Sequence, residues 1–99
     1  MADEEPAQPT EDELRERLEE ELQKLAVSDV LVQSLYTVSG LGFHRLTSDH
    51  RDLDQARLAI EAMRALVPLL KDAVPEQVTR ELEQTIAGLQ LAYAKAVSG

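Results

Sequence analysis

Two stretches of apolar residues at helical spacing, separated by a short connection, constrain most strongly how this chain can fold. In residues 51–71 and 75–97, apolar side chains recur every three or four residues, which places them on one face of an α-helix. A connection of a few residues makes consecutive helices antiparallel neighbours. The sequence therefore predicts an antiparallel helical hairpin over residues 51–97, roughly 30 Å long at about 1.5 Å per residue.

The main apolar stripe of each predicted helix should face the other helix. These stripes are Leu53, Ala56, Ile60, Met63, Val67 and Leu70 in the first helix, and Val78, Leu82, Ile86, Leu89, Tyr93 and Val97 in the second. Each helix also has a second stripe: Leu58, Ala62, Ala65 and Leu69, and Ala87, Leu91 and Ala94. Because one neighbour covers one stripe, we expect a further helix and a second copy of the chain to cover the rest, as a homodimer. The interface candidates are Leu53, Ile60, Met63, Val67, Leu82, Ile86, Leu89, Leu91 and Tyr93.

A helix over residues 29–43 is predicted to supply part of that cover, because it is apolar on two sides. One side contains Leu31, Leu35, Val38 and Leu41, and the other contains Val32, Tyr36, Ser39 and Phe43. Ser28 is expected to cap its start, since a serine oxygen accepts a hydrogen bond from a free first-turn amide. Gly40 and Gly42 are expected to fray or end it.

The boundaries of helix 51–71 depend on two local features. Ser48 or Asp49 is expected to cap its start. Pro68 lies inside the apolar pattern but has no amide to donate to the carbonyl of Arg64. We therefore expect the last turn to be kinked or the regular helix to end early.

The first 24 residues differ from the rest in charge. They contain ten acidic and three basic residues, a net charge of -7, which is most of the net charge of -9 of the whole chain. Residues 1–9 are predicted to be a disordered acidic tail, and residues 10–26 an acidic helical arm that begins with a Thr10–Glu13 capping box. Its apolar stripe is one leucine wide: Leu14, Leu18, Leu22 and Leu25. Such an arm either docks loosely on the helical domain 27–99 or forms one strand of a coiled coil, and we favour docking.

These elements predict an all-α protein, a small bundle of three to four helices with a C-terminal antiparallel hairpin. With 99 residues and only 3% aromatic residues, the chain can build one domain with a thin core. It has no cysteine, which excludes disulfides and thiolate zinc sites. Without a basic face, nucleic-acid and anionic membrane partners are not expected. No apolar run is long enough for a membrane span or fits a signal peptide, so a cytoplasmic protein is expected.

The densest group of potentially reactive side chains lies in residues 44–54: His44, Thr47, Ser48, Asp49, His50, Asp52 and Asp54. Their spacing matches no recognised run of metal ligands, and helix capping explains the serine and the acids. No glycine-rich oxyanion turn lies near the histidines, so no catalytic residue, metal or cofactor is predicted. A small-ligand or metal site near His44, His50 and Asp54 is kept as an alternative.

The residues of the hairpin also carry a family resemblance. The run HRDLDQARLAIEAMRAL, followed by Glu81-Leu82, Leu89, Leu91 and Tyr93, resembles the small bacterial domain-of-unknown-function family eighteen-forty-four, and actinobacterial members most. The resemblance covers residues 50–95. It implies a helical fold and supplies no catalytic residues, because the family has no assigned function.

The sequence therefore predicts a non-enzymatic helical protein that acts by self-association and by binding an unidentified protein partner. Besides the small-ligand or metal alternative, an acidic arm could compete for the basic surface of another protein, because it concentrates negative charge.

Overall fold

The computed structural model describes residues 8–47 and 49–99 of the chain. Its elements are α1 (Glu11–Lys24), α2 (Val27–His44), α3 (Leu53–Leu66), the short 3-10 helix η2 (Val67–Leu70) and α4 (Glu76–Ser98). No strand occurs in the described residues. The predicted all-α class is confirmed.

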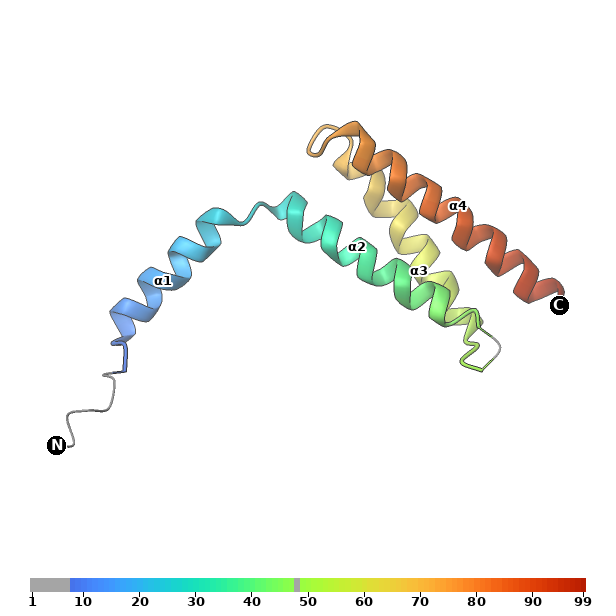
Figure 1. Ribbon diagram of the computed structural model, residues 1–99, viewed down its shortest axis with the longest axis horizontal. Helices are drawn as coiled ribbons and strands as arrows, with labels where there is room; N and C mark the ends of the chain where they lie inside the picture. Colours follow the sequence, from blue (N-terminus) through green and yellow to red (C-terminus); the bar gives the residue numbers. More distant parts are fainter. Residues whose placement is uncertain (1–7, 48) are drawn as a thin grey trace.

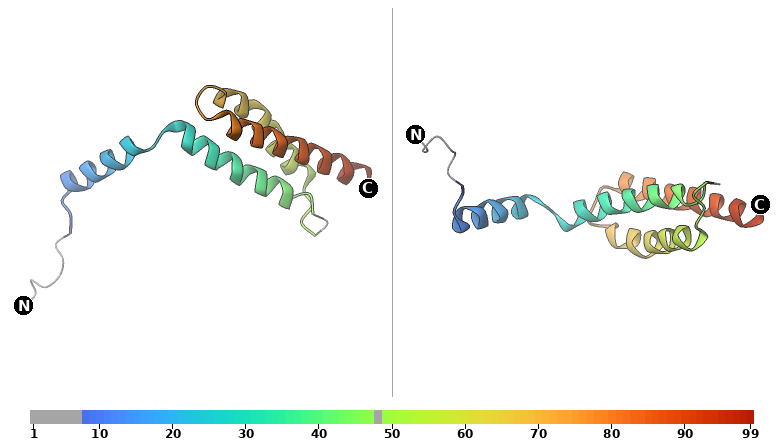
Figure 2. Two further views of the ribbon diagram at one scale, coloured as in Figure 1. Left: turned by 45° about the horizontal axis from the view of Figure 1, so that its top comes forward. Right: turned by 90° about the horizontal axis from the view of Figure 1, so that it is seen from below.

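Helices α2, α3 and α4 form a three-helix bundle in which each helix packs against the other two. Figure 1 shows α3 and α4 as an antiparallel pair joined at one end, with α2 beside them and α1 extending away. The second view of Figure 2 shows α3 on one side of both α2 and α4. The predicted C-terminal hairpin is confirmed, and α2 is its third partner.

The core of the bundle consists of the stripes that the sequence indicated. Its largest fully buried side chains are Leu35 from α2, Met63 from α3, Leu70 from η2, and Leu82 and Leu89 from α4. Each buried leucine or methionine contributes about 1.5–3 kcal/mol relative to an exposed one. The bundle therefore obtains its stability mainly from aliphatic packing.

Gly42 lies within α2 and does not end it, so the prediction that Gly40 and Gly42 terminate this helix is wrong. A Cβ atom on Gly42 would lie 2.9 Å from the Cβ of Ala59 and 3.2 Å from Cδ2 of Leu89. Neither glycine has a positive φ. Gly42 is needed for the close approach of α2 to α3 and α4, and a helix held by such packing tolerates glycine.

The start of α2 also differs from the prediction. The residue at its N-cap is Ala26, which makes no side-chain hydrogen bond, and Ser28 already lies in the first turn. Ser28 therefore does not cap this helix. Apolar packing of α2 stabilises a helix whose first amides have no side-chain acceptor.

Asp52 caps α3, with its Oδ1 accepting a hydrogen bond from the amide of Gln55 at 3.2 Å. The prediction that Asp49 supplies this cap is wrong, because Asp49 lies three positions before the cap residue. Ser48, the other predicted cap, lies outside the described residues. The negative charge of the Asp52 carboxylate also interacts favourably with the positive end of the helix dipole.

The end of α3 confirms the prediction for Pro68. The α-helix ends at Leu66 and the chain continues as η2, with Pro68 in its first turn. Because proline has no amide hydrogen, the α-helical bond to the carbonyl of Arg64 cannot form. The tighter turn keeps Val67 and Leu70 in the core.

Helix α1 does not dock on the bundle. It has no buried residue, and Figure 1 shows it leading away from the start of α2. The prediction of a docked arm is therefore wrong for the single chain. The capping oxygen is as predicted, since Thr10 Oγ1 accepts a hydrogen bond from the amide of Glu13 at 3.1 Å.

Candidate interaction surfaces

The first candidate surface is the leucine face of α1. Thr10 and an acidic first turn, Glu11 to Glu13, stabilise the start of this helix by capping and by interaction with its dipole. The side chains of Leu14, Leu18, Leu22 and Leu25 are 52–59% exposed. Leu14, Leu18 and Leu22 lie along one side of the helix and Leu25 is its C-cap, and these four leucines form an apolar surface that lacks a partner in the single chain.

The link between α1 and α2 sets the direction of this surface. Leu25 has φ -95° and ψ 127°, and Ala26 has φ -94° and ψ 143°, so both residues are extended. The chain bends by 78° between the two helices. Because both linking residues are extended, the chain does not double back at this point, and α1 diverges from the bundle.

The second candidate surface is a groove between α2 and α3, which we call the α2–α3 groove. Its volume is about 400 Å³. It is lined by Val38, Leu41, Gly42, Arg45, Gln55, Leu58, Ala59 and Ala62. Leu41 and Leu58 are 56% and 58% exposed. The lining is mostly apolar because the outer stripe of α3 meets one face of α2 there.

The sequence pattern indicated the apolar residues of this groove but not the groove itself. The pattern placed Leu41 on one face of α2 and Leu58 on the second stripe of α3, but it did not indicate that the two faces adjoin. Arg45, which follows the last residue of α2, lines the same groove. The second apolar stripe of each helix indicated that an exposed apolar surface exists. Which two stripes lie next to each other depends on how α2 crosses α3, and the sequence pattern does not indicate that.

A third apolar patch lies on the outer side of α4. Leu91 is 60% exposed, and Ala87 and Ala94 are also exposed. These residues form the second stripe that the sequence predicted for this helix. The stripe faces away from the core and contains a single large side chain.

The predicted interface candidates divide into two groups in the structure. Ile60, Met63, Val67, Leu82 and Leu89 are buried in the core of the single chain, with Leu53, Ile86 and Tyr93 half-buried. Leu91 is exposed. Any surface between two folded chains must therefore use residues such as Leu91, Leu58 and the leucines of α1.

The loop between α2 and α3 brings two of its predicted residues together. The rings of His44 and His50 stack with their centroids 4.5 Å apart and their planes at 21°. Imidazole nitrogens bind a metal in the plane of the ring at about 2 Å, so stacked rings do not aim at one ion. Among the described residues, no three His, Asp or Glu side chains are grouped so that they could hold a metal.

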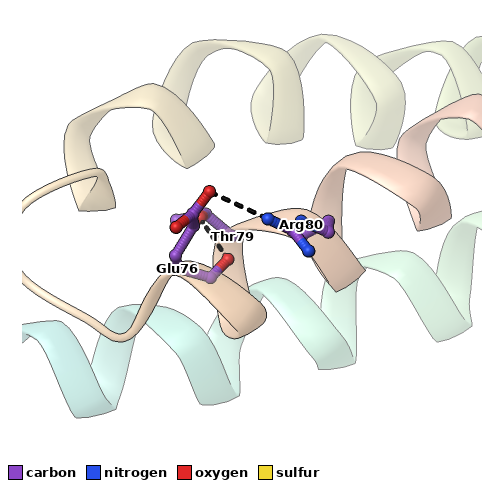
Figure 3. Close-up of polar contacts among 3 residues, drawn as sticks. All are labelled: Glu76, Thr79 and Arg80. Carbon is purple, nitrogen blue, oxygen red and sulfur yellow. Dashed lines mark hydrogen bonds and ion pairs between the residues drawn. The ribbon is translucent and has the colours of Figure 1, made fainter.

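A polar hollow of about 620 Å³ lies where η2 meets the start of α4. Glu76, Thr79 and Arg80 line this hollow from α4, and Figure 3 shows the contacts among these three residues. Arg80 Nη2 lies 2.9 Å from Glu76 Oε1, and Thr79 Oγ1 donates to the carbonyl of Glu76 at 2.9 Å. These groups pair with their own helix, so the hollow presents no unpaired charge among them for a ligand.

Tyr36 and Glu81 connect α2 to α4 near this end of the bundle. Tyr36 Oη donates a hydrogen bond to Glu81 Oε2 over 3.4 Å. Burial raises the pKa of Tyr36 above its ordinary value, and the negative charge and hydrogen bond of Glu81 raise that pKa further. The phenol is protonated at neutral pH, and it serves there as a link between helices.

In the part of the chain that the structure describes, no single helix is both long and apolar enough to cross a membrane. Only α1 and α2 taken together, with their 78° bend, have the length and composition of a span.

Comparisons with protein-family models, with curated proteins and with solved structures found no match to this chain. The resemblance of residues 50–95 to domain-of-unknown-function family eighteen-forty-four therefore stays a prediction.

Proposed function

We propose that this chain is a non-enzymatic helical protein that acts by self-association, as a homodimer, and by binding another protein. The observation that carries the proposal is the leucine face of α1. A helix with no buried residue exposes four leucines, and monomeric proteins rarely leave such a contiguous apolar surface uncovered.

Two further observations support this proposal. The α2–α3 groove provides a second exposed apolar surface. Among the potentially reactive side chains of residues 44–54, Asp52 caps α3, Thr47 Oγ1 donates a hydrogen bond to the carbonyl of His44, and the rings of His44 and His50 stack. The family that residues 50–95 resemble supplies no catalytic role that would compete with this proposal.

The native mass of the purified chain tests self-association directly. We expect a dimer at micromolar concentration by native mass spectrometry and by light scattering. A variant with Leu18→Gln and Leu22→Gln should shift the mass towards the monomer without loss of the bundle, because both side chains are outside the core. A wild-type chain that stays monomeric, and that binds no dye specific for apolar surfaces, would refute the proposal.

A second candidate function rests on the charge of the same arm. The back of α1, opposite its leucines, contains Asp12, Glu13, Glu16 and Glu20 at helical spacing, and all four are exposed. Such a face suits the basic surface of another protein. Binding of this type should weaken steeply with salt and should be lost when residues 1–24 are removed, whereas binding through the leucines should survive salt.

A further inference from the structure

We propose that the α2–α3 groove of one chain binds helix α1 of a second copy, and that the second copy's groove binds α1 of the first. The inference rests on the proposed self-association and names the surfaces that perform it. Two chains then exchange arms, and each arm and each groove is used once. A reciprocal pair of contacts closes as a dimer and leaves no free end for further chains.

The two surfaces match in chemistry. The arm offers Leu14, Leu18, Leu22 and Leu25 along one side, and the groove offers apolar side chains from two helices. A leucine-faced helix that lies against the two helices of the groove completes a four-helix arrangement, in which apolar stripes from all four helices cover one another. The groove's α3 wall runs from Gln55 to Ala62, which is eight residues, so about two turns of the 14-residue arm can lie along it.

The charges of the two surfaces are complementary. Arg45 is the charged residue among those that line the α2–α3 groove. Residues 11–24 contain seven acidic and three basic residues, a net charge of -4. Glu11 and Glu21 lie at positions next to the leucine stripe by helical periodicity. An acidic arm that enters a groove with a guanidinium at its edge gains attraction as well as apolar contact.

The arm of the same chain is poorly placed to occupy this groove. If α1 folded back along its own α2, both helices would advance about 1.5 Å per residue, so Leu22 would oppose Val30 and Leu14 would oppose Val38. The α2 wall of the groove runs from Val38 to Arg45. Only the first turn of the arm would reach it, and Leu58 would stay uncovered.

The link between the helices favours the exchange in a second way. Folding back requires the chain to reverse at residues 25–26, but both residues are extended. Figure 1 shows the arm directed away from its own bundle, where another chain can receive it. The same geometry that prevents docking within one chain therefore presents α1 to a second copy.

Two exposed leucines provide a matched pair of variants. Leu58 in the groove is 58% exposed and Leu91 on the outer side of α4 is 60% exposed, so replacing either one should preserve the bundle. We expect Leu58→Glu to raise the dissociation constant of the dimer by about tenfold or more, because docking would bury an unpaired carboxylate. Leu91→Glu should leave the constant unchanged.

Cross-linking identifies which surfaces meet, and the absence of cysteine from the natural chain gives a clean background. We would mix a Leu18→Cys chain with a Leu58→Cys chain and add a short bifunctional maleimide. Every Leu18–Leu58 product must join two chains, because each chain has one cysteine. Leu18→Cys mixed with Ala87→Cys, on the outer face of α4, is the control.

The expected result is an efficient Leu18–Leu58 product and little product with Ala87. The proposal is overturned by predominant Leu18–Leu18 products, which indicate a coiled coil of two arms. It is also overturned if a chain with both Leu18→Cys and Leu58→Cys yields only cross-linked monomer. A dimer that survives Leu58→Glu but not Leu91→Glu would refute the arm exchange and leave the proposed self-association intact. A wild-type monomer would refute both.

Discussion

Helices α1 and α4 both have leucines on an apolar face, but those of α1 are exposed, whereas Leu82 and Leu89 of α4 are buried in the core. Leu18 in α1 is 59% exposed, whereas Leu82 in α4 is fully buried. Both helices place leucines at helical spacing, and α1 also has a side-chain cap at Thr10. What differs is the width of the apolar face and the connection to the next element.

The width of the face decides how many neighbours a helix can bind. Helix α2 contacts α3 through one side and α4 through another, and its core residue Leu35 is fully buried between them. Helix α1 has a stripe one leucine wide and an extended link at Ala26. The comparison teaches that capping and periodicity are enough to form a helix, whereas a place in the core also needs a wide face and a turn that returns the chain.

The largest expected effect separates these two regions. Met63→Asp places a carboxylate at a fully buried position, which should cost more than about 4 kcal/mol and unfold most of the chain. Leu18→Asp should change the free energy of unfolding of the bundle by less than about 0.5 kcal/mol in dilute monomer. Circular dichroism during urea unfolding measures both. Equal losses would mean that α1 belongs to the cooperative unit.

A smaller effect is expected where α2 meets α3. Gly42→Ala puts a methyl group 2.9 Å from the Cβ of Ala59, so α2 and α3 would have to move apart. The substitution should therefore destabilise the bundle by about 1–3 kcal/mol. Gly40 has nothing within 4 Å of the corresponding position. Gly40→Ala should therefore stabilise α2 by up to about 1 kcal/mol, through helix propensity alone.

The two glycine variants sharpen the comparison because they lie two residues apart in one helix. Their opposite signs would show that packing, and not helix propensity, controls stability in the bundle. Thermal unfolding measures both variants, and Ala59→Gly combined with Gly42→Ala should recover part of the loss. If both glycine variants stabilise equally, the close approach of α2 to α3 is wrong.

Most of the fold could be predicted from the periodicity of apolar residues in the sequence. The stripe with Ile60 and Met63, the stripe with Leu82 and Leu89, and the short connection between them predicted the hairpin, and Pro68 predicted the end of α3. These features are local, because each depends on residues within a few turns of one helix. The sequence also indicated that both helices had a spare stripe.

The errors came from properties that only the assembled bundle determines. Gly42 reads as a helix end, but its lack of a side chain serves the contact with Ala59. Asp52, and not Asp49, caps α3. The amide of Asp52 donates a hydrogen bond to the carbonyl of Arg45 where the chain returns to the bundle, and α3 begins directly after this bond. Predicting the α2–α3 groove requires knowing which helix faces adjoin, and the pattern of apolar residues in a single sequence does not contain that information.

The smallest expected effect compares two helix caps of the same geometry. Thr10 Oγ1 accepts from the Glu13 amide at 3.1 Å, and Asp52 Oδ1 accepts from the Gln55 amide at 3.2 Å. Removing such a cap costs about 1 kcal/mol of helix stability. Asp52→Ala should lower the free energy of unfolding of the bundle by that amount, because α3 supplies part of the core.

Thr10→Ala should leave the unfolding of the bundle unchanged, since α1 contributes no buried side chain. Its effect should instead be local and should accelerate amide hydrogen exchange within residues 11–24 in dilute monomer. At concentrations where two chains form the arm-exchanged dimer, amide hydrogen exchange within residues 11–24 should slow again, because docking in the groove of the second copy protects the helix. Thr10→Ala would then weaken the dimer as well, since each arm must be helical to present its leucines together.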